Sequence, residues 1–152
     1  MDLHMGNKLR SNVYEATSPQ FPSTIVARFA LFSWEVLYLD AETLAYQRIE
    51  SQSIGPKFLG HITEDGRVIG FIMEKVVGGK HAKPEDLSLC QAALSRLHRL
   101  EIKHGDVNKH NFLIHDGRAT LIDFDNATQD SKEEDLVAEF QSTWKILLGE
   151  EG

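Results

Sequence analysis

The chain has 152 residues, of which 41% are hydrophobic and 26% charged, with 11 glycines, four prolines and one cysteine, Cys90. This composition is typical of a single globular domain and excludes a disordered or collagen-like chain. A lone cysteine excludes a disulfide framework, and with the polar start Met1–His4 it favours a reducing, cytoplasmic setting. No apolar run approaches the ~20 residues that span a bilayer, so we expect no membrane partner.

The net charge of −7 is confined to the last third of the chain. Residues 1–100 have 11 Lys and Arg against 11 Asp and Glu, whereas residues 101–152 have five against 12. An acidic balance disfavours nucleic acid as a partner, because binding to phosphates needs many basic contacts. Locally crowded carboxylates have two ordinary explanations, a solvated face or a site for a divalent cation.

The first half of the chain predicts strands around one helix. Apolar β-branched residues at Thr24–Leu31 predict a buried strand. In Leu39–Ile49 the apolar residues recur at helical intervals, which predicts a helix. Lys57–Thr63 and Val68–Met73 then flank an Asp-Gly pair, which predicts a tight hairpin between two antiparallel strands. The glycine-containing stretch Val76–Lys80 is a flexible connection.

The second half predicts two helices around a short hairpin. Pro84–Asp86 is a favourable helix opening, and an apolar stripe continues that helix to about Arg99. A second Asp-Gly pair separates strands at Phe112–His115 and Thr120–Phe124. An amphipathic helix is expected at Glu133–Leu148. Its apolar face would carry Leu136, Val137, Phe140, Trp144, Leu147 and Leu148.

One segment carries chemistry: His104–Asn111 has the pattern HxDxxxxN, and the next hairpin ends in the acidic sequence Leu121–Asp125. Phosphoryl transfer to a hydroxyl needs one carboxylate that accepts the acceptor's proton and oxygen ligands that hold Mg²⁺. Asp106 has the position of the first group. Asn111 and Asp123 have the positions of the metal ligands.

With these residues the chain resembles the protein-kinase-like superfamily. The resemblance implies that Gly6–Tyr14 takes the place of the glycine-rich loop, with Gly6 and Val13 against the nucleotide. It implies that Ala27 also contacts nucleotide and that Arg28 stands at the position of the phosphate-pairing lysine. Glu42, in the following helix, falls where the superfamily has the glutamate that pairs with that lysine.

The resemblance also implies a nucleotide site beside the connection between two lobes. Met73 would be the gatekeeper, the backbone of Glu74 to Val76 would receive adenine, and Ile122 would also contact the nucleotide. The implied fold is α+β and bilobal, with a β-rich N-lobe at 1–77, a linker at 78–80 and a reduced, mostly helical C-lobe at 81–152. ATP and Mg²⁺ are the implied cofactors.

The expected function is an ATP- and Mg²⁺-dependent transfer of phosphate to a hydroxyl acceptor, either a small molecule or a protein. Compact relatives such as aminoglycoside and lipopolysaccharide kinases share the HGDxxxxN form. Two alternatives remain open: a pseudokinase-like nucleotide-binding or regulatory module, and a fragment. The first is motivated by the single glycine of the loop, by arginine at position 28 and by the missing large-lobe elements, and the second by the short chain.

Several residues have a second interpretation. Gly6 also fits a simple turn, and Glu42 also fits a solvated helix position. Asp125 is either a second metal carboxylate or a turn residue. The histidines of the second half do not have the spacing of a zinc motif. Cys90 lies on the apolar stripe and fits a small core residue.

Overall fold

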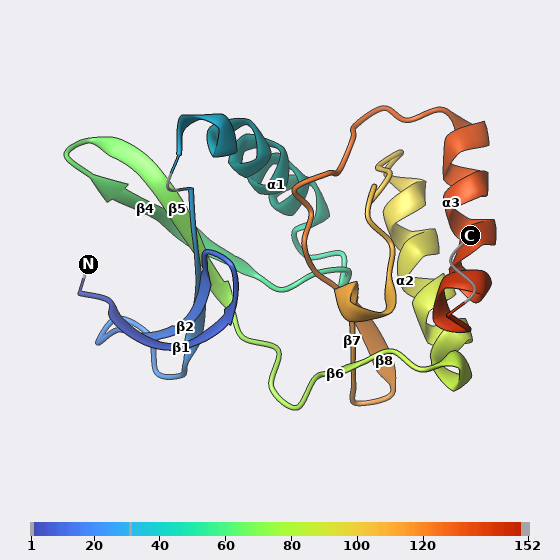
Figure 1. Cartoon of the computed structure of the whole chain (residues 1–152), viewed down its shortest axis with the longest axis horizontal. Helices are drawn as coiled ribbons and strands as arrows, with labels where there is room; N and C mark the ends of the chain where they lie inside the picture. The colour runs from blue at the N-terminus through green and yellow to red at the C-terminus, as the bar shows by residue number, and fades with distance from the viewer. Residues whose placement is uncertain (1, 31, 150–152) are drawn as a thin grey trace.

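The computed structural model describes residues 2–30 and 32–149, which form two lobes joined by one connection (Figure 1). We call β1–β5 with α1 the N-lobe, and β6–β8 with α2 and α3 the C-lobe. The elements are β1 His4–Arg10, β2 Val13–Thr17, β3 Ile25–Phe29, α1 Val36–Ile49, β4 Phe58–Glu64, β5 Arg67–Glu74, β6 Lys80–His81, α2 Leu87–Arg99, β7 Phe112–His115, β8 Arg118–Leu121 and α3 Glu133–Leu147. Single 3₁₀ turns lie at Ser33–Glu35, Pro84–Asp86 and Lys109–Asn111.

The N-lobe is an antiparallel sheet in the order β1-β2-β3-β5-β4. The strand predicted at 24–31 forms the central strand β3. The predicted hairpin is present as β4 and β5, and both turn residues, Asp65 and Gly66, have positive φ angles of 52° and 76°. Such backbone angles match the twist of the flanking strands, which explains why Asp-Gly marks this turn.

Helix α1 packs on one face of this sheet, above the connection to the C-lobe (Figure 1). It begins at Val36, three residues before the predicted start, and the side chain of Leu37 is 76% exposed. Leu39, Tyr46 and Ile49 are buried in the main core, as the helical spacing predicts. Glu42 is buried in the same stripe, so a carboxylate faces the interior of the protein.

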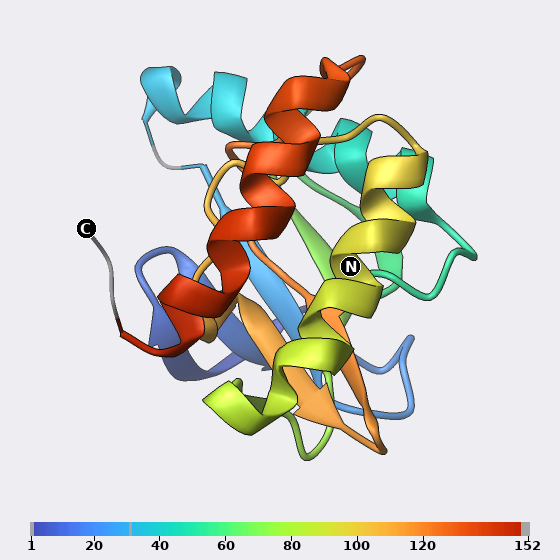
Figure 2. The same cartoon turned by 90° about the vertical axis from the view of Figure 1, so that its right-hand side faces the viewer.

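In the C-lobe, α2 packs against the β8 strand of a small three-stranded sheet, and α3 lies beside α2, as Figure 2 shows. The predicted opening at Pro84–Asp86 is a 3₁₀ turn in which the Asp86 carboxylate accepts a hydrogen bond from Lys83 N at 2.9 Å. Helix α2 buries Cys90, Leu94 and Leu97 completely. In the part of the chain that the structure describes, none of the helices has the length and apolar character required to cross a bilayer.

The second hairpin is shorter than the sequence predicts, because β8 ends at Leu121 and not at Phe124. The backbone at Asp123 has a φ angle of +62°, in the left-handed region that a strand cannot contain. Aspartate is among the few residues that tolerate this region. The chain therefore turns at Asp123, at the edge of the C-lobe that faces the N-lobe.

Helix α3 is present at nearly the predicted bounds, but its predicted buried face is only partly correct. Leu136 and Leu147 are buried and Phe140 packs against the core, whereas the other three predicted residues are exposed. Val137, Trp144 and Leu148 are 45%, 42% and 52% exposed. The buried positions are Leu136, Glu139, Thr143 and Leu147, which lie on one side of the helix at steps of three and four residues. A carboxylate and a hydroxyl thus replace part of the expected apolar stripe, and the buried glutamate determines which side of α3 faces the protein.

Candidate active site

A cavity of about 400 Å³ lies between the two lobes, within the size range of ligand pockets. The N-lobe contributes Leu9, Arg10 and Val26, and the connection contributes residues 73–76. The C-lobe lies opposite, with residues of the catalytic-loop pattern and of the turn at Asp123. Six residues predicted from the sequence therefore line one cavity: Met73, Glu74, Val76, Asn111, Ile122 and Asp123.

Four predicted nucleotide contacts, Gly6, Val13, Ala27 and Arg28, are not among the residues that line this cavity. Ala27 packs in a second core cluster on the other face of the sheet. Side chains alternate along a strand, so Val26 and Arg28 share the face that Ala27 avoids, and Val26 lines the cavity instead. Gly6 lies within strand β1 and not in a loop, and Val13 is fully buried in the main core.

Arg28 and Glu42 form an ion pair, with Arg28 Nε 2.5 Å from Glu42 Oε1. The side chains are 16% and 0% exposed, so Glu42 is a buried partner of Arg28 and not a solvated helix residue. The other Glu42 oxygen accepts a hydrogen bond from Phe124 N at 3.3 Å, and Arg28 Nη2 lies 3.7 Å from Asp125 Oδ2. Arg28 is thus occupied by carboxylates, and it does not line the cavity.

Burial raises the pKa of Glu42 to about 7, although the charge of Arg28 acts in the opposite direction. Asp125 and Asp123 add to the increase because like charges disfavour ionisation. The Arg28–Glu42 contact also lacks the linear geometry of a hydrogen bond, since neither Arg28 Nε nor Glu42 Oε1 has a hydrogen-bond partner. The pair therefore connects β3, α1 and the 124–125 segment through charge more than through directed hydrogen bonds.

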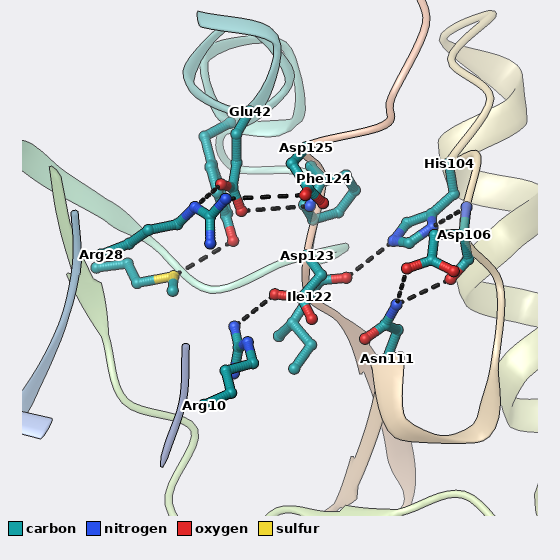
Figure 3. Close-up of polar contacts among 12 residues, drawn as sticks. Arg10, Arg28, Glu42, His104, Asp106, Asn111, Ile122, Asp123, Phe124 and Asp125 are labelled. Atoms are coloured by element: carbon teal, nitrogen blue, oxygen red, sulfur yellow. Dashed lines mark hydrogen bonds and ion pairs between the residues drawn. The ribbon is translucent and has the colours of Figure 1, made fainter. Parts of the chain in front are cut away.

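Asp106 and Asn111 contact each other in the catalytic loop (Figure 3). Asn111 Nδ2 donates to the Asp106 carbonyl at 2.8 Å and lies 3.3 Å from its carboxylate. Asn108 Nδ2 approaches the other carboxylate oxygen at 3.3 Å, and Asn108 Oδ1 accepts from His110 N at 2.8 Å. These contacts hold the Asp106 carboxylate, which is exposed, in one orientation above the loop.

His104 connects this loop to the turn at Asp123 (Figure 3). Its buried ring accepts a hydrogen bond at Nδ1 from Asp106 N at 3.2 Å, so Nε2 carries the proton and donates to the Ile122 carbonyl at 2.8 Å. Gly105 has a φ angle of +88°, and a Cβ at this position would lie 2.3 Å from the Asn126 carbonyl oxygen. Only glycine therefore allows the two segments to approach this closely.

Glu139, on α3, holds the same loop from the other side and was not predicted from the sequence. Its carboxylate accepts hydrogen bonds from His104 N at 2.9 Å, Gly105 N at 2.8 Å and His98 Nε2 at 2.8 Å. Burial alone would raise the pKa of Glu139, but these three hydrogen bonds outweigh it and hold the pKa below its usual range. The signal available in the sequence is a glutamate placed three residues after Leu136, within the apolar stripe.

Asp123 and Asn111 have the oxygen donors that Mg²⁺ prefers. The Asn111 amide nitrogen points to Asp106, so its oxygen is left on the side of the cavity that Asp123 also lines (Figure 3). The residues that the structure describes contain no group of three or more His, Cys, Asp or Glu side chains able to hold a metal. One carboxylate and one amide still fit Mg²⁺, which commonly takes its remaining ligands from phosphates and water.

Arg10 is the second site residue that the sequence did not predict. Its Nη2 lies 2.5 Å from Asp123 Oδ1, and both side chains line the cavity. The arginine comes from the end of β1, 113 residues away in the sequence. A charged residue near the tip of a hairpin is common, so the sequence contains no clear signal for this contact.

A wider groove of about 890 Å³ begins at Asp106, on the side away from the N-lobe. The catalytic loop forms one wall, from Asp106 to Asn111, and the C-terminal half of α3 forms the other. Asn111 lines both this groove and the cavity between the lobes. The two spaces therefore meet at the residues of the HxDxxxxN pattern.

Comparisons with known proteins agree with this geometry. A model of the lipopolysaccharide kinase (Kdo/WaaP) family matches residues 76–142. A probable bifunctional tRNA threonylcarbamoyladenosine biosynthesis protein of Methanospirillum hungatei is 30% identical over 110 residues, which are 70% of this chain and 20% of that protein. The protein with the same name in Methanoculleus marisnigri is 38% identical over 66 residues, which are 41% of this chain and 12% of that protein.

Among solved structures, the Cydia pomonella granulovirus kinase PK-1 matches 84% of this chain with a TM-score of 0.66 at 18% sequence identity. Together these matches support the protein-kinase-like superfamily for this chain. The predicted α+β fold, with a sheet-based N-lobe and a helical C-terminal part, is confirmed.

The matches to kinases support a phosphotransferase-like function within the protein-kinase-like superfamily. The chain spans a fifth or less of the length of the two curated relatives and about half of the viral kinase. The family match covers α2, the catalytic loop and most of α3, the region that contains Asp106, Asn111, Asp123 and Glu139. Arg10 and Arg28 lie outside it, in the N-lobe.

Proposed function

We propose that this protein is an ATP- and Mg²⁺-dependent phosphotransferase that moves the γ-phosphate of ATP to a hydroxyl acceptor. The observation that carries the proposal is the meeting of two spaces at Asn111. The inter-lobe cavity is of the right size for a nucleotide, and the groove beyond Asp106 offers room for an acceptor. The transferred group would cross between them where the HxDxxxxN residues are held.

Each residue has a role that follows from its position. Asp106 orients the acceptor hydroxyl and accepts its proton, because its carboxylate is exposed and fixed by Asn108 and Asn111. Asp123 and Asn111 hold Mg²⁺, which when bound neutralises charge on the phosphates. Residues 74–76 line the cavity, and adenine would bind beside them through their backbone.

Arg28 and Glu42 act on this site by positioning. They connect β3 and α1 to Phe124 and Asp125, the residues that directly follow the metal ligand Asp123. Movement of α1 would therefore move the turn at Asp123. His104 and Glu139 hold Asp106 in the same indirect way from the C-lobe.

A thermal-shift titration with ATP, with and without Mg²⁺, followed by an assay of ATP turnover, tests the proposal. Bound nucleotide at about 100 times its Kd adds roughly 2.7 kcal/mol to stability. We expect an Mg²⁺-dependent shift and a slow turnover that Asp106→Asn abolishes. Asp116→Asn is the matched control, since Asp116 lies 90% exposed in the β7–β8 turn.

A second function is favoured by one observation: in this structure Arg10 is bound to Asp123, the proposed metal ligand. A pseudokinase-like module would keep nucleotide binding without turnover. It predicts a thermal shift in both the wild type and Asp106→Asn, with no ATP consumed by either. No shift at millimolar ATP would contradict both functions.

A further inference from the structure

The inter-lobe cavity contains an arginine that the superfamily motif does not account for. Arg10 lines the cavity, whereas Arg28, at the position of the phosphate-pairing lysine, does not. Arg28 is engaged by Glu42 and lies near Asp125, so its guanidinium is turned to carboxylates of α1 and of the 124–125 segment. The arginine that faces a bound nucleotide is therefore Arg10.

A bulge in β1 places Arg10 in this position. Lys8 is paired with Tyr14, but Arg10 is paired with Val13, so two residues of β1 advance against one of β2. On a regular strand Arg10 would share the face of Lys8, and adjacent residues such as Leu9 and Arg10 would point to opposite faces. Both line the cavity. Bulges re-aim side chains in this way.

The turn of this hairpin contains no glycine, so it lacks the close backbone amides with which a glycine-rich loop binds phosphates. Its residues are Ser11 and Asn12, and Asn12 is anchored away from the cavity. The Asn12 side chain donates to Glu35 Oε2 at 2.8 Å, and its carbonyl accepts from Phe29 N at 2.8 Å. A side-chain cation is what the hairpin offers to the cavity in place of backbone amides.

We propose that Arg10 binds the phosphates of the nucleotide and that Mg²⁺ displaces it from Asp123. This inference rests on the proposed function. Arg10 Nη2 and Mg²⁺ would compete for Asp123 Oδ1, because two positive charges held beside the same carboxylate oxygen repel each other. The Arg10 side chain is already 34% exposed while it is paired with Asp123. Once released, its guanidinium can form the paired hydrogen bonds that arginine makes with phosphate oxygens. Arg10 is a binding residue in one state and a block on the metal site in the other.

Calorimetric titration of the wild-type protein and Arg10→Gln with three probes tests this inference without any turnover. The probes are a non-hydrolysable ATP analogue with Mg²⁺, adenosine, and Mn²⁺ alone. We expect Arg10→Gln to lower the affinity for the ATP analogue about tenfold, which is the loss expected for one hydrogen bond to a charged group. Adenosine affinity should not change, and Mn²⁺ alone should bind more tightly.

Two further variants provide controls. Arg10→Lys keeps the positive charge and should recover part of the affinity for the ATP analogue. Arg67→Gln removes an exposed arginine from the other hairpin of the same sheet, so all three affinities should equal those of the wild type. A substitution that merely disturbed the N-lobe would weaken the binding of adenosine as much as that of the ATP analogue. That result would overturn the role of Arg10 in phosphate binding.

The outcomes separate the inference from the function on which it rests. If the wild-type protein does not bind the ATP analogue, both are overturned. If it binds and Arg10→Gln binds equally well, the nucleotide function stands and the role of Arg10 is overturned. If Arg10→Gln lowers the affinity for the ATP analogue but does not raise the affinity for Mn²⁺, Arg10 does not compete with the metal for Asp123.

Discussion

The carboxylate of Glu42 is surrounded by groups of both signs. It has no exposed surface, and its neighbours are Arg28, the Phe124 amide and the charges of Asp125 and Asp123. Burial disfavours the charged form more than Arg28 favours it, so the pKa of Glu42 rises from 4.5 to about 7. At neutral pH a fraction of the protein therefore has a neutral Glu42 and a weakened contact to Arg28.

This pKa predicts how stability depends on pH. Between pH 4.5 and 7 the folded protein binds more protons at Glu42 than the unfolded chain, so this group's contribution to the free energy of unfolding falls as pH rises. In urea unfolding, the stability of the wild type minus that of Glu42→Gln should fall across this window, by at most about 3 kcal/mol. A difference independent of pH would show that Glu42 is ionised throughout. Glu50→Gln, at the exposed end of α1, is the control.

Cys90 gives a second prediction at the scale of one residue. Its side chain is fully buried, and burial, with a smaller effect of the Asp86 charge, raises the pKa of the thiol to about 12. Because the thiolate is the reactive form, a disulfide reagent at pH 7.5 should not modify the native protein. One equivalent should react after unfolding in guanidinium chloride. Rapid modification of the native protein would contradict the packing of α2.

At the scale of elements, α3 acts on the catalytic loop through Glu139. Three hydrogen bonds to one buried carboxylate join the helix to His98, on α2, and to the two residues that precede Asp106. Hydrogen bonds to a charged group contribute more than neutral ones, and removal of the charge leaves the donors without a good acceptor. These hydrogen bonds explain why Glu139 is buried on α3, whereas Trp144 is exposed.

Substitution of Glu139 should loosen the loop as well as the fold. We expect Glu139→Gln to lower the free energy of unfolding by about 1–3 kcal/mol and to speed amide exchange at His104 and Gly105. Because the pKa of Glu139 lies below 4.5, the difference from the wild type should shrink as pH falls below that value. Glu134→Gln changes an exposed residue of the same helix and should have little effect. Equal effects of the two substitutions would contradict the bracing role.

Short-range patterns predicted much of the structure, and contacts between distant segments account for the rest. The Asp-Gly turns, the stripe of α2 and the His104–Asn111 pattern each depend on residues near one another in sequence. The bulge that re-aims Arg10 depends on pairing with β2, and the face of α3 depends on two backbone amides about 35 residues away. Neither leaves a periodic signal.

The same distinction explains the errors within the site. Arg28 pairs with Glu42, as its motif position implies, but it does not line the cavity. Ala27 was assigned to the cavity that its neighbour Val26 lines. Alignment to a motif recovers chain order, whereas the alternation of the strand decides which side chain points inward. The resemblance assigned a glycine to phosphate binding, and the structure offers an arginine at the same hairpin.

At the scale of the whole molecule, the excess acidic residues of the last third of the chain are divided between the candidate site and the surface. The N-lobe brings two arginines, Arg10 and Arg28, to the acidic residues Asp123 and Asp125 of the C-lobe. The Arg10–Asp123 pair lies at the cavity, whereas the Arg28–Asp125 pair joins the two lobes outside its lining. Binding of a metal and a nucleotide would replace one set of opposite charges with another.

The most direct test of this site is to locate a bound metal–nucleotide complex by nuclear magnetic resonance. With Mn²⁺ and a non-hydrolysable ATP analogue, paramagnetic broadening should be strongest at the amides of Asn111, Ile122 and Asp123, and should disappear in Asp123→Asn. Another cavity of this protein has Lys57, His115 and Arg118 in its lining, and the amide signals of these three residues should remain sharp. Broadening centred on that cavity, or none that depends on nucleotide, would contradict the assignment of Asp123 and Asn111 as the metal ligands.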